Sequence, residues 1–201
     1  MDESIPTMME PDLETERLRI RRLDLNDAES CHRLYLDIGW ADTTLSEAEN
    51  RALRQSLVEW SVQNYVQLAR LRQPPYGDRA VVEKHNGTFV GMVGFAPTIV
   101  PLGQLPSFGA LEHARCGPEV GFFWAVAPAS QRQGYATEAG KAMLEYAFRT
   151  LGLQRVIATT KRTNVASIGV MRRLGMNVEE NPYPEPSWFQ TCGVAVWSDQ
   201  T

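Results

Sequence analysis

One stretch of the chain combines a basic side chain, amide side chains and a glycine in a short loop. It reads Gln131-Arg132-Gln133-Gly134-Tyr135-Ala136 and follows the strongly apolar run 120–127. A helical pattern begins near Thr137. A strand that passes through such a loop into a helix directs free backbone N–H groups and the positive end of the helix dipole at one point. The sequence therefore predicts a seat for a phosphate or pyrophosphate at this loop.

Two familiar phosphate loops do not fit this stretch. The P-loop requires a Gly-Lys-Ser/Thr ending, but Tyr135 and Ala136 follow Gly134. The dinucleotide fingerprint requires three glycines at the first strand–helix turn, and this loop has one glycine and lies late in the chain. A third pattern, Gln/Arg-x-x-Gly-x-Gly/Ala after a strand, matches it.

The composition of the chain restricts the class of protein to which this loop can belong. The chain has 201 residues, 43% of them hydrophobic, and carries a net charge of −4, so we expect a single soluble domain without general nucleic-acid binding. The three cysteines are widely spaced, which disfavours a disulfide framework and suits a reducing compartment. No apolar stretch reaches the length of a membrane span, and no signal-peptide pattern is found, so the cytoplasm is the expected location.

The first half of the chain predicts strands and two helices. After a flexible leader over residues 1–12, an alternating strand over 14–23 points Arg17, Arg19 and Arg21 to solvent. Helices are expected over 28–38 and over 46–71, the second with a Ser46 capping box. A hairpin follows, in which Asn86-Gly87 predicts a type I′ turn.

The second half alternates strands with helices around the loop. A long connection over 101–118 precedes the apolar strand, and a helix over 137–151 places Glu138 on its polar, solvent-facing side. Asn164 is expected to cap the helix 165–174. The element order predicts an α/β or α+β domain over residues 13–201 with a mixed sheet.

With this loop and its flanking segments, the sequence resembles the GCN5-related N-acetyltransferase (GNAT) superfamily, and within it the ribosomal-protein N-terminal acetyltransferase (RimJ/RimL-like) branch. The resemblance covers roughly residues 13–197 and is carried by the segments 131–139, 15–18, 119–122, 164–168 and 174–176. It implies a GNAT-like, mostly antiparallel central sheet of six to seven strands with about four helices and a splay between strands four and five.

The resemblance also implies acetyl-coenzyme A as donor and a primary amine as acceptor. The pantetheine arm would pair with the strand near Ala125, Val126 and Ala127, with a backbone N–H around Val126 for the oxyanion. The residues expected to bind the cofactor are Ala125, Val126, Ala127, Gln131, Arg132, Gln133, Gly134, Tyr135, Ala136, Thr137, Asn164 and Ser167.

Acetyl transfer needs a neutral amine, a stabilised oxyanion and a protonated leaving thiolate. Glu119 is the candidate base and acceptor contact, with a solvated strand-end carboxylate as an equal alternative. Asn164 and Ser167 are the other catalytic candidates. Many family members carry a tyrosine general acid seven residues after the asparagine, where this chain has Met171, so the acid is Ser167, water or absent. Trp40 either borders the acceptor or simply packs.

Several function classes stay open. The leading hypothesis is an N-acetyltransferase that acts by direct attack in a ternary complex, on a protein N-terminus or similar amine. The alternatives are a small-molecule amine acetyltransferase and a non-catalytic acyl-CoA sensor. His113 and Cys116 stand three residues apart without a second pair, so we expect no metal. We expect no nucleic-acid or membrane partner, and either a monomer or a homodimer.

Overall fold

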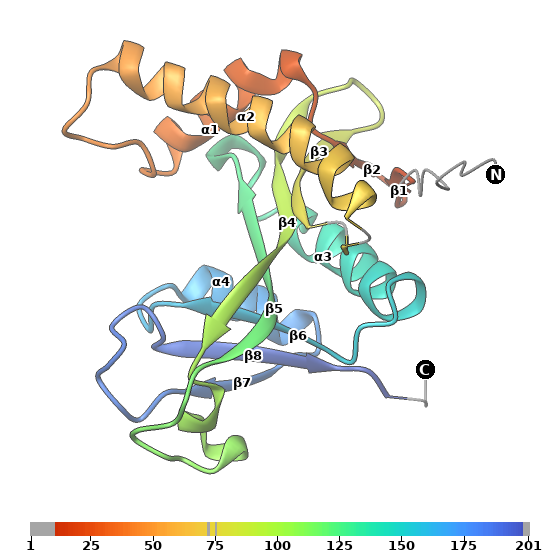
Figure 1. Ribbon diagram of the computed structural model, residues 1–201. Coiled ribbons are helices and arrows are strands. Elements are labelled where there is room, and N and C mark those ends of the chain that lie inside the picture. The colour runs from red at the N-terminus through yellow and green to blue at the C-terminus, as the bar shows by residue number, and fades with distance from the viewer. Residues whose placement is uncertain (1–10, 72, 75, 199–201) are drawn as a thin grey trace. The chain divides into compact units, whose positions relative to one another are not determined.

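The computed structural model describes residues 11–71, 73, 74 and 76–198 (Figure 1). Its eight-stranded sheet has the order β1-β2-β3-β4-β5-β6-β8-β7. The strands are β1 Leu13–Glu14, β2 Leu18–Arg22, β3 Gly77–Glu83, β4 Phe89–Val100, β5 Gly117–Val126, β6 Arg155–Thr160, β7 Asn177–Glu180 and β8 Thr191–Val196. The α-helices are α1 Ala28–Asp37, α2 Glu47–Arg70, α3 Tyr135–Glu145 and α4 Val165–Arg173.

The sheet is mixed and mostly antiparallel, as the sequence predicts. It has eight strands instead of six or seven because the short β1 pairs with β2, Leu13 opposite Ile20. The parallel partners β5 and β6 are registered at one residue pair, Gly121 with Ile157. So limited a pairing fits the splay expected between the fourth and fifth strands of the family. Of the leader expected over residues 1–12, positions 1–10 lie outside the described residues.

The chain divides into two compact units. The first unit comprises Met1–Phe95 and Trp124–Ala142, and the second comprises Ala96–Phe123 and Met143–Thr201. Strands β4 and β5 each contribute residues to both units, which is why neither unit is a continuous segment of the chain.

In the first unit, α1 and α2 contact each other, and α2 contacts β3 (Figure 1). Leu18 and Ile20 of β2 are fully buried, as the alternating pattern predicts, and Leu34 and Val58 are among the buried positions of α1 and α2. The capping box at Ser46 is present, because its side chain accepts from the Glu49 N–H while the Glu49 carboxylate accepts from the Ser46 N–H. Local capping chemistry thus sets where α2 begins.

The hairpin between β3 and β4 corrects one prediction. A type I′ turn needs a positive φ at both central residues, but Gly87 has φ +73° and Asn86 is not in the left-handed region. The Gly87 N–H donates to the Glu83 carbonyl, and the Asn86 Oδ1 accepts from the Thr88 N–H. The asparagine therefore forms a side-chain turn, and glycine alone supplies the left-handed residue.

The helix expected over 137–151 differs at both ends. It begins two residues earlier, at Tyr135, and its α-helical hydrogen bonding ends at Glu145. The next turn, Tyr146–Thr150, is a π-helix, and Gly152 follows with φ +66°. A π-turn holds one residue more than an α-turn, an irregularity that side-chain periodicity does not reveal.

The second unit has its own core, formed by Val100, Leu102, Leu105, Ile157, Phe189, Cys192 and Val194, with Phe108 packed against it. Helix α4 contacts β6, β7 and β8 (Figure 1). The connection before β5 supplies part of this core through two short 3-10 turns, Leu102–Gln104 and Pro106–Phe108. Its buried Gln104 donates to the carbonyls of Glu112 and Glu185 and accepts from Asn181, so this segment is packed as well as connecting.

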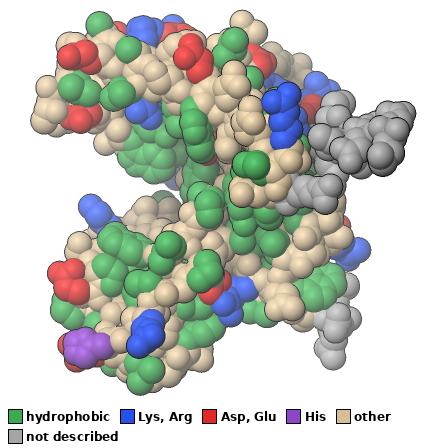
Figure 2. Space-filling model, viewed as in Figure 1, with side chains coloured by type: hydrophobic (Ala, Val, Ile, Leu, Met, Phe, Trp, Pro, Cys, Tyr) green, Lys and Arg blue, Asp and Glu red, His purple; other side chains and the backbone are tan. Residues whose placement is uncertain are grey.

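Charge is distributed without a dominant patch on the face that Figure 2 shows, where Lys and Arg side chains are scattered among Asp and Glu. Among the residues that the structure describes, no helix is both long and apolar enough to cross a membrane.

Candidate functional site

The loop predicted from the sequence lies between β5 and α3 in the first unit. Strand β5 ends at Val126, a 3-10 turn spans Pro128–Ser130, and α3 begins at Tyr135. The Ala127 N–H donates to the Val90 carbonyl at 2.9 Å, which ties the start of this connection to β4. Gly91 permits that close approach, because a Cβ there would lie 2.1 Å from the Ala125 carbonyl oxygen.

Backbone donors gather in the 131–136 loop. Arg132 and Gly134 have φ of +61° and +88°, with Gln133 between them outside the left-handed region. Within the described part of the chain, none of the N–H groups of residues 132–136 donates to a backbone carbonyl. Alternation of left-handed and ordinary residues at a helix start turns successive N–H groups toward one point, the arrangement known as an anion nest.

The loop side chains divide between structure and charge. Gln131 Nε2 donates to the Val126 carbonyl at 3.0 Å, and Gln133 Nε2 donates to the Ala129 carbonyl at 3.1 Å. These amides therefore brace the loop. Arg132 is exposed, and no ion pair or hydrogen bond of its guanidinium is found within residues 11–71, 73, 74 and 76–198. Its charge is available to an anion at the nest.

Two residues that the sequence does not single out as functional hold this loop from the side. Glu138, expected on a solvated helix face, is only 18% exposed and is paired with Arg17 of the segment before β2. The Arg17 Nε donates to Glu138 Oε2 at 2.7 Å, and the Arg17 Nη1 donates to the Gln133 carbonyl at 3.0 Å. Arg17 is 41% exposed, as expected of a residue on a solvated face, but its guanidinium is paired with Glu138. Residues 121 positions apart leave no periodic signal that would pair them.

Tyr135, the first residue of α3, is buried and is fixed by its hydroxyl. The Tyr135 Oη donates to Glu83 Oε1 at 2.6 Å, and the Arg17 guanidinium lies 4.6 Å from the centre of its ring. The hydrogen bond to Glu83 raises the pKa of Tyr135, and the same contact lowers the pKa of Glu83. The Tyr135 hydroxyl is therefore occupied by Glu83, and the backbone N–H of Tyr135 is the group that is available to a ligand.

Glu119, the candidate base, lies near the start of β5 in the second unit and makes a two-point ion pair. Arg155 Nε donates to Glu119 Oε2 at 2.9 Å, and Arg155 Nη2 donates to Glu119 Oε1. The Glu119 side chain is 10% exposed, so it is not the solvated strand-end carboxylate of the alternative interpretation. The contact with Glu119 raises the pKa of Arg155, which stays charged.

Asn164 and Ser167 come together at the start of α4, also in the second unit. The Asn164 Oδ1 accepts from the Ser167 N–H at 3.2 Å, which confirms the predicted cap, and its Nδ2 donates to Thr160 Oγ1 at 3.0 Å. Met171, at the position of the family's usual tyrosine, is 1% exposed and lies over Gly193, where a Cβ would be 3.1 Å from its Sδ. It is a core residue.

Trp40 lies just after α1 in the first unit and is 50% exposed. Its ring meets the Tyr35 ring edge to face at 5.5 Å, and the backbone N–H of Trp40 donates to the Tyr35 carbonyl. The Arg54 guanidinium covers the Tyr35 ring at 4.0 Å. Trp40 thus has a packed edge and an open face.

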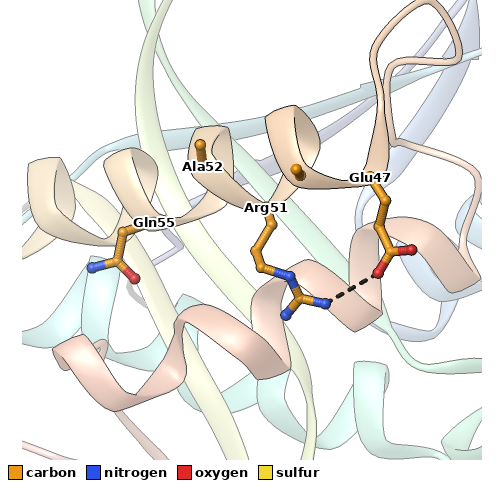
Figure 3. Close-up of a pocket in the computed structure, with 5 residues that line it drawn as sticks. Glu47, Arg51, Ala52 and Gln55 are labelled. Atoms are coloured by element: carbon orange, nitrogen blue, oxygen red, sulfur yellow. Dashed lines mark hydrogen bonds and ion pairs between the residues drawn. The ribbon is translucent and has the colours of Figure 1, made fainter.

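A shallow pocket on α2 holds none of the predicted site residues. Figure 3 shows Glu47, Arg51, Ala52 and Gln55 along one side of the helix, with Arg51 bound to Glu47 at 3.1 Å. Arg51 also pairs with Glu29 of α1. A paired arginine on an open helix surface supplies neither a nucleophile nor a base. No cluster of metal-ligating side chains is found among the described residues.

Comparison with known proteins identifies the kind of fold that carries these sites. The uncharacterized N-acetyltransferase YnaD of Bacillus subtilis is 45% identical over 56 residues, 28% of this chain and 33% of that protein. The FsC-acetyl coenzyme A-N(2)-transacetylase of Aspergillus fumigatus is 38% identical over 104 residues, 50% of this chain and 41% of that protein. The chain thus spans less than half the length of these two curated relatives.

A solved structure extends the fold likeness over nearly the whole chain. The ribosomal-protein-S5-alanine acetyltransferase from Vibrio fischeri superposes with a TM-score of 0.64 at 15% identity, covering 96% of this chain and 100% of that one. At that identity the likeness concerns the fold. The acetyltransferase (GNAT) domain itself matches residues 17–177, which include the nest, Glu119, Asn164 and Ser167. The chain therefore belongs to the GNAT acetyltransferase family.

Proposed function

We propose that this protein is an acetyl-coenzyme-A-dependent N-acetyltransferase that moves an acetyl group to a primary amine. The observation that carries the proposal is the set of backbone N–H groups over residues 132–136, at the start of α3 in a GNAT domain, that donate to no backbone carbonyl of the described residues. A pyrophosphate offers several charged oxygens to such donors, and each hydrogen bond to a charged oxygen contributes about 1.5–3 kcal/mol. The exposed Arg132 adds charge at the same place.

The backbone of β5 supplies the next element of the proposal. Successive N–H groups of a strand point to opposite edges, and that of Ala127 is taken by Val90 of β4. The Val126 N–H therefore points to the other edge of β5. We assign it to the thioester carbonyl, whose oxygen gains negative charge when the amine attacks. Ala125 and Ala127 would border the pantetheine arm.

The reaction is a direct substitution at the thioester. The neutral amine nitrogen attacks the carbonyl carbon, an amide bond forms, and the carbon–sulfur bond breaks. The proton lost by the amine goes to a base, and the departing thiolate takes up a proton. Glu119 is the proposed base, because each of its oxygens accepts one guanidinium N–H and keeps lone-pair capacity for a water or an amine.

In the second unit, Asn164 and Ser167 are assigned to the donor molecule. The Asn164 cap leaves the Ser167 hydroxyl without a hydrogen-bond partner among the described residues, so it can donate to the coenzyme. Met171 is buried and has no proton to give, which leaves Ser167 or water as the acid for the thiolate. The amine-bearing acceptor is assigned to the open face of Trp40.

Two acceptor classes are supported by the names of similar proteins. The Vibrio fischeri neighbour is a ribosomal-protein-S5-alanine acetyltransferase, which favours a protein N-terminus. The Aspergillus fumigatus relative is an FsC-acetyl coenzyme A-N(2)-transacetylase, so its named acceptor is FsC and not a ribosomal protein. We propose a protein or peptide N-terminus as the acceptor, since the likeness to the first covers nearly the whole chain.

Release of free thiol from acetyl-coenzyme A tests the proposal. Peptides with a free α-amine, the same peptides with blocked termini, amino sugars and polyamines form the acceptor panel. We expect turnover with free α-amines and none with blocked peptides. Turnover confined to amino sugars or polyamines would shift the acceptor class, and coenzyme binding without any turnover would indicate a sensor. Arg132→Gln should weaken coenzyme A binding and its dependence on salt, because one cation is lost from the pyrophosphate seat.

A further inference from the structure

We propose that Arg17 and Glu138 are positioning residues that fix the 131–136 loop in its anion-binding conformation before a ligand arrives. The inference rests on the proposed binding of coenzyme A at this loop. It assigns a role to two residues that do not belong to the nest and that lie 121 positions apart in the chain.

Glu138 is held by several donors at once. Its Oε1 accepts from the Thr15 hydroxyl at 2.6 Å and from the Arg17 N–H at 2.9 Å. Its Oε2 accepts from the Arg17 Nε at 2.7 Å and lies 2.6 Å from the Arg17 Nη2. Hydrogen bonds from Thr15 and Arg17 lower the pKa of Glu138 despite its partial burial. The first turn of α3 is thereby fastened to the segment that leads into β2.

Arg17 transmits this anchorage to the loop through three consecutive residues. Its Nη1 donates to the Gln133 carbonyl at 3.0 Å, and its guanidinium stacks on the Tyr135 ring at 4.6 Å. A Cβ on Gly134 would lie 3.4 Å from its Nη2. The guanidinium therefore rests along the side of the loop, with Glu138 holding it in place.

The contact with Gln133 determines where an amide hydrogen points. The carbonyl of Gln133 and the N–H of Gly134 belong to one planar trans peptide group, so they point in opposite directions. A carbonyl directed at Arg17 sends the Gly134 N–H away from Arg17. The left-handed φ of Gly134 then carries the Tyr135 N–H into the same nest.

A direct role for Arg17 in binding phosphate predicts the opposite response to mutation. If Arg17 were a phosphate ligand, removal of the competing Glu138 carboxylate would leave it freer and would lessen repulsion of the anion, so affinity would rise. If Arg17 positions the loop, loss of the carboxylate loosens the guanidinium and affinity falls. Glu138→Gln therefore separates the two roles by the sign of its effect.

The experiment measures coenzyme A binding by calorimetry with the full chain and the variants Arg17→Lys, Glu138→Gln and Arg19→Ala. Arg19 is the matched control, because it lies on β2 and pairs with Glu14 at 3.0 Å on the surface. We expect about 10- to 100-fold weaker binding for the first two variants, the range seen when outer supports of a site are lost, and wild-type binding for Arg19→Ala.

Acetyl-pantetheine, which lacks the pyrophosphate, separates loop positioning from general damage. Arg17→Lys and Glu138→Gln should keep wild-type turnover of acetyl-pantetheine and lose efficiency with acetyl-coenzyme A through KM. Hydrogen exchange without ligand should show faster exchange at the amides of positions 137 and 138 in both variants, because these amides donate to the Gly134 carbonyl and lose protection when the loop loosens. Unchanged coenzyme A affinity, tighter binding by Glu138→Gln, or equal losses with both donors would overturn the inference.

The two proposals fail in different ways. Absence of coenzyme A binding by the wild-type protein would refute the proposed function. Loop exchange would still report whether Arg17 and Glu138 hold the loop, since that measurement needs no ligand. Exchange at the amides of positions 137 and 138 that matches wild type in both variants would refute the positioning role on its own.

Discussion

Glu119 and Arg155 form a two-point ion pair at the starts of two neighbouring strands, β5 and β6. Arg155 also lies 5.5 Å from the centre of the Phe108 ring, so the pair joins the strands to the segment before β5. This ion pair fixes the orientation of the Glu119 carboxylate. Each carboxylate oxygen already accepts one hydrogen bond from Arg155, which occupies one of its lone pairs. The ion pair with Arg155 therefore determines both the orientation of Glu119 and the lone pairs that it has left to accept a proton.

Glu119→Gln tests the base assignment through pH. Glutamine keeps the shape of the side chain and cannot accept a proton, so kcat/KM should fall by about 10²–10⁴-fold at pH 7. The loss should shrink as pH rises toward the pKa of the acceptor amine, because more amine is then already neutral. Steady-state rates from pH 6 to pH 10 measure this. If Glu119→Gln keeps wild-type rates but has a lower melting temperature, Glu119 has a structural role alone. Arg155→Lys is the comparison variant, because it changes the ion pair and keeps the Glu119 carboxylate.

Gly134→Ala should impair coenzyme binding beyond its effect on stability. Gly134 has φ +88°, where an alanine costs about 1–2 kcal/mol, and the new Cβ would lie 3.4 Å from Arg17 Nη2. Gly39→Ala is the matched control, since Gly39 has φ +73° with nothing within 4 Å of a Cβ. Both variants should lose similar stability in chemical denaturation, and only Gly134→Ala should raise the KM for acetyl-coenzyme A. Equal KM values would show that the loop tolerates relaxation.

Two substitutions at Asn164 separate its cap from a contact with the coenzyme. Asn164→Ala removes the acceptor for the Ser167 N–H and should cost about 1 kcal/mol of stability. Asn164→Ser keeps a capping oxygen but removes the amide nitrogen, so stability should stay near wild type. A raised KM for acetyl-coenzyme A in Asn164→Ser would support the contact. Identical kinetics for Asn164→Ser and wild type would leave the cap as the only role.

Asp78→Asn should stabilise the protein in a pH-dependent manner. Burial raises the pKa of Asp78 to about 6, and no hydrogen bond reaches its carboxylate within the described residues. Between about pH 4 and pH 6 the folded state binds more protons than the unfolded state, so the Asp78 contribution lowers stability as pH rises through that window. Asp78→Asn should therefore raise the free energy of unfolding by about 3 kcal/mol at pH 8 and leave it nearly unchanged at pH 4.

The control for Asp78 is the exposed Glu112, which makes no side-chain hydrogen bond with the described residues. Glu112→Gln should change the free energy of unfolding little at either pH. Urea denaturation at pH 4 and pH 8 measures both variants. A stabilisation by Asp78→Asn of equal size at both pH values would show that ionisation of Asp78 is not the cause.

The sequence alone determined the features that depend on near neighbours in the chain. Residue type and spacing predict the 131–136 loop, the Ser46 capping box and the Asn164 cap, because each is formed by residues a few positions apart. Likewise, the alternation of β2 predicts its buried Leu18 and Ile20. The motifs that carry the GNAT resemblance are local for the same reason.

Only the tertiary structure decided which charges meet. Arg17 and Glu138 each fit an ordinary solvated face by periodicity, and they pair because the fold brings the segment before β2 to the first turn of α3. In the same way, Glu119 meets Arg155 across two strands, and Met171 is buried because Gly193 leaves it room. Periodicity tells which face of an element a residue occupies, and packing of distant segments determines what that face touches.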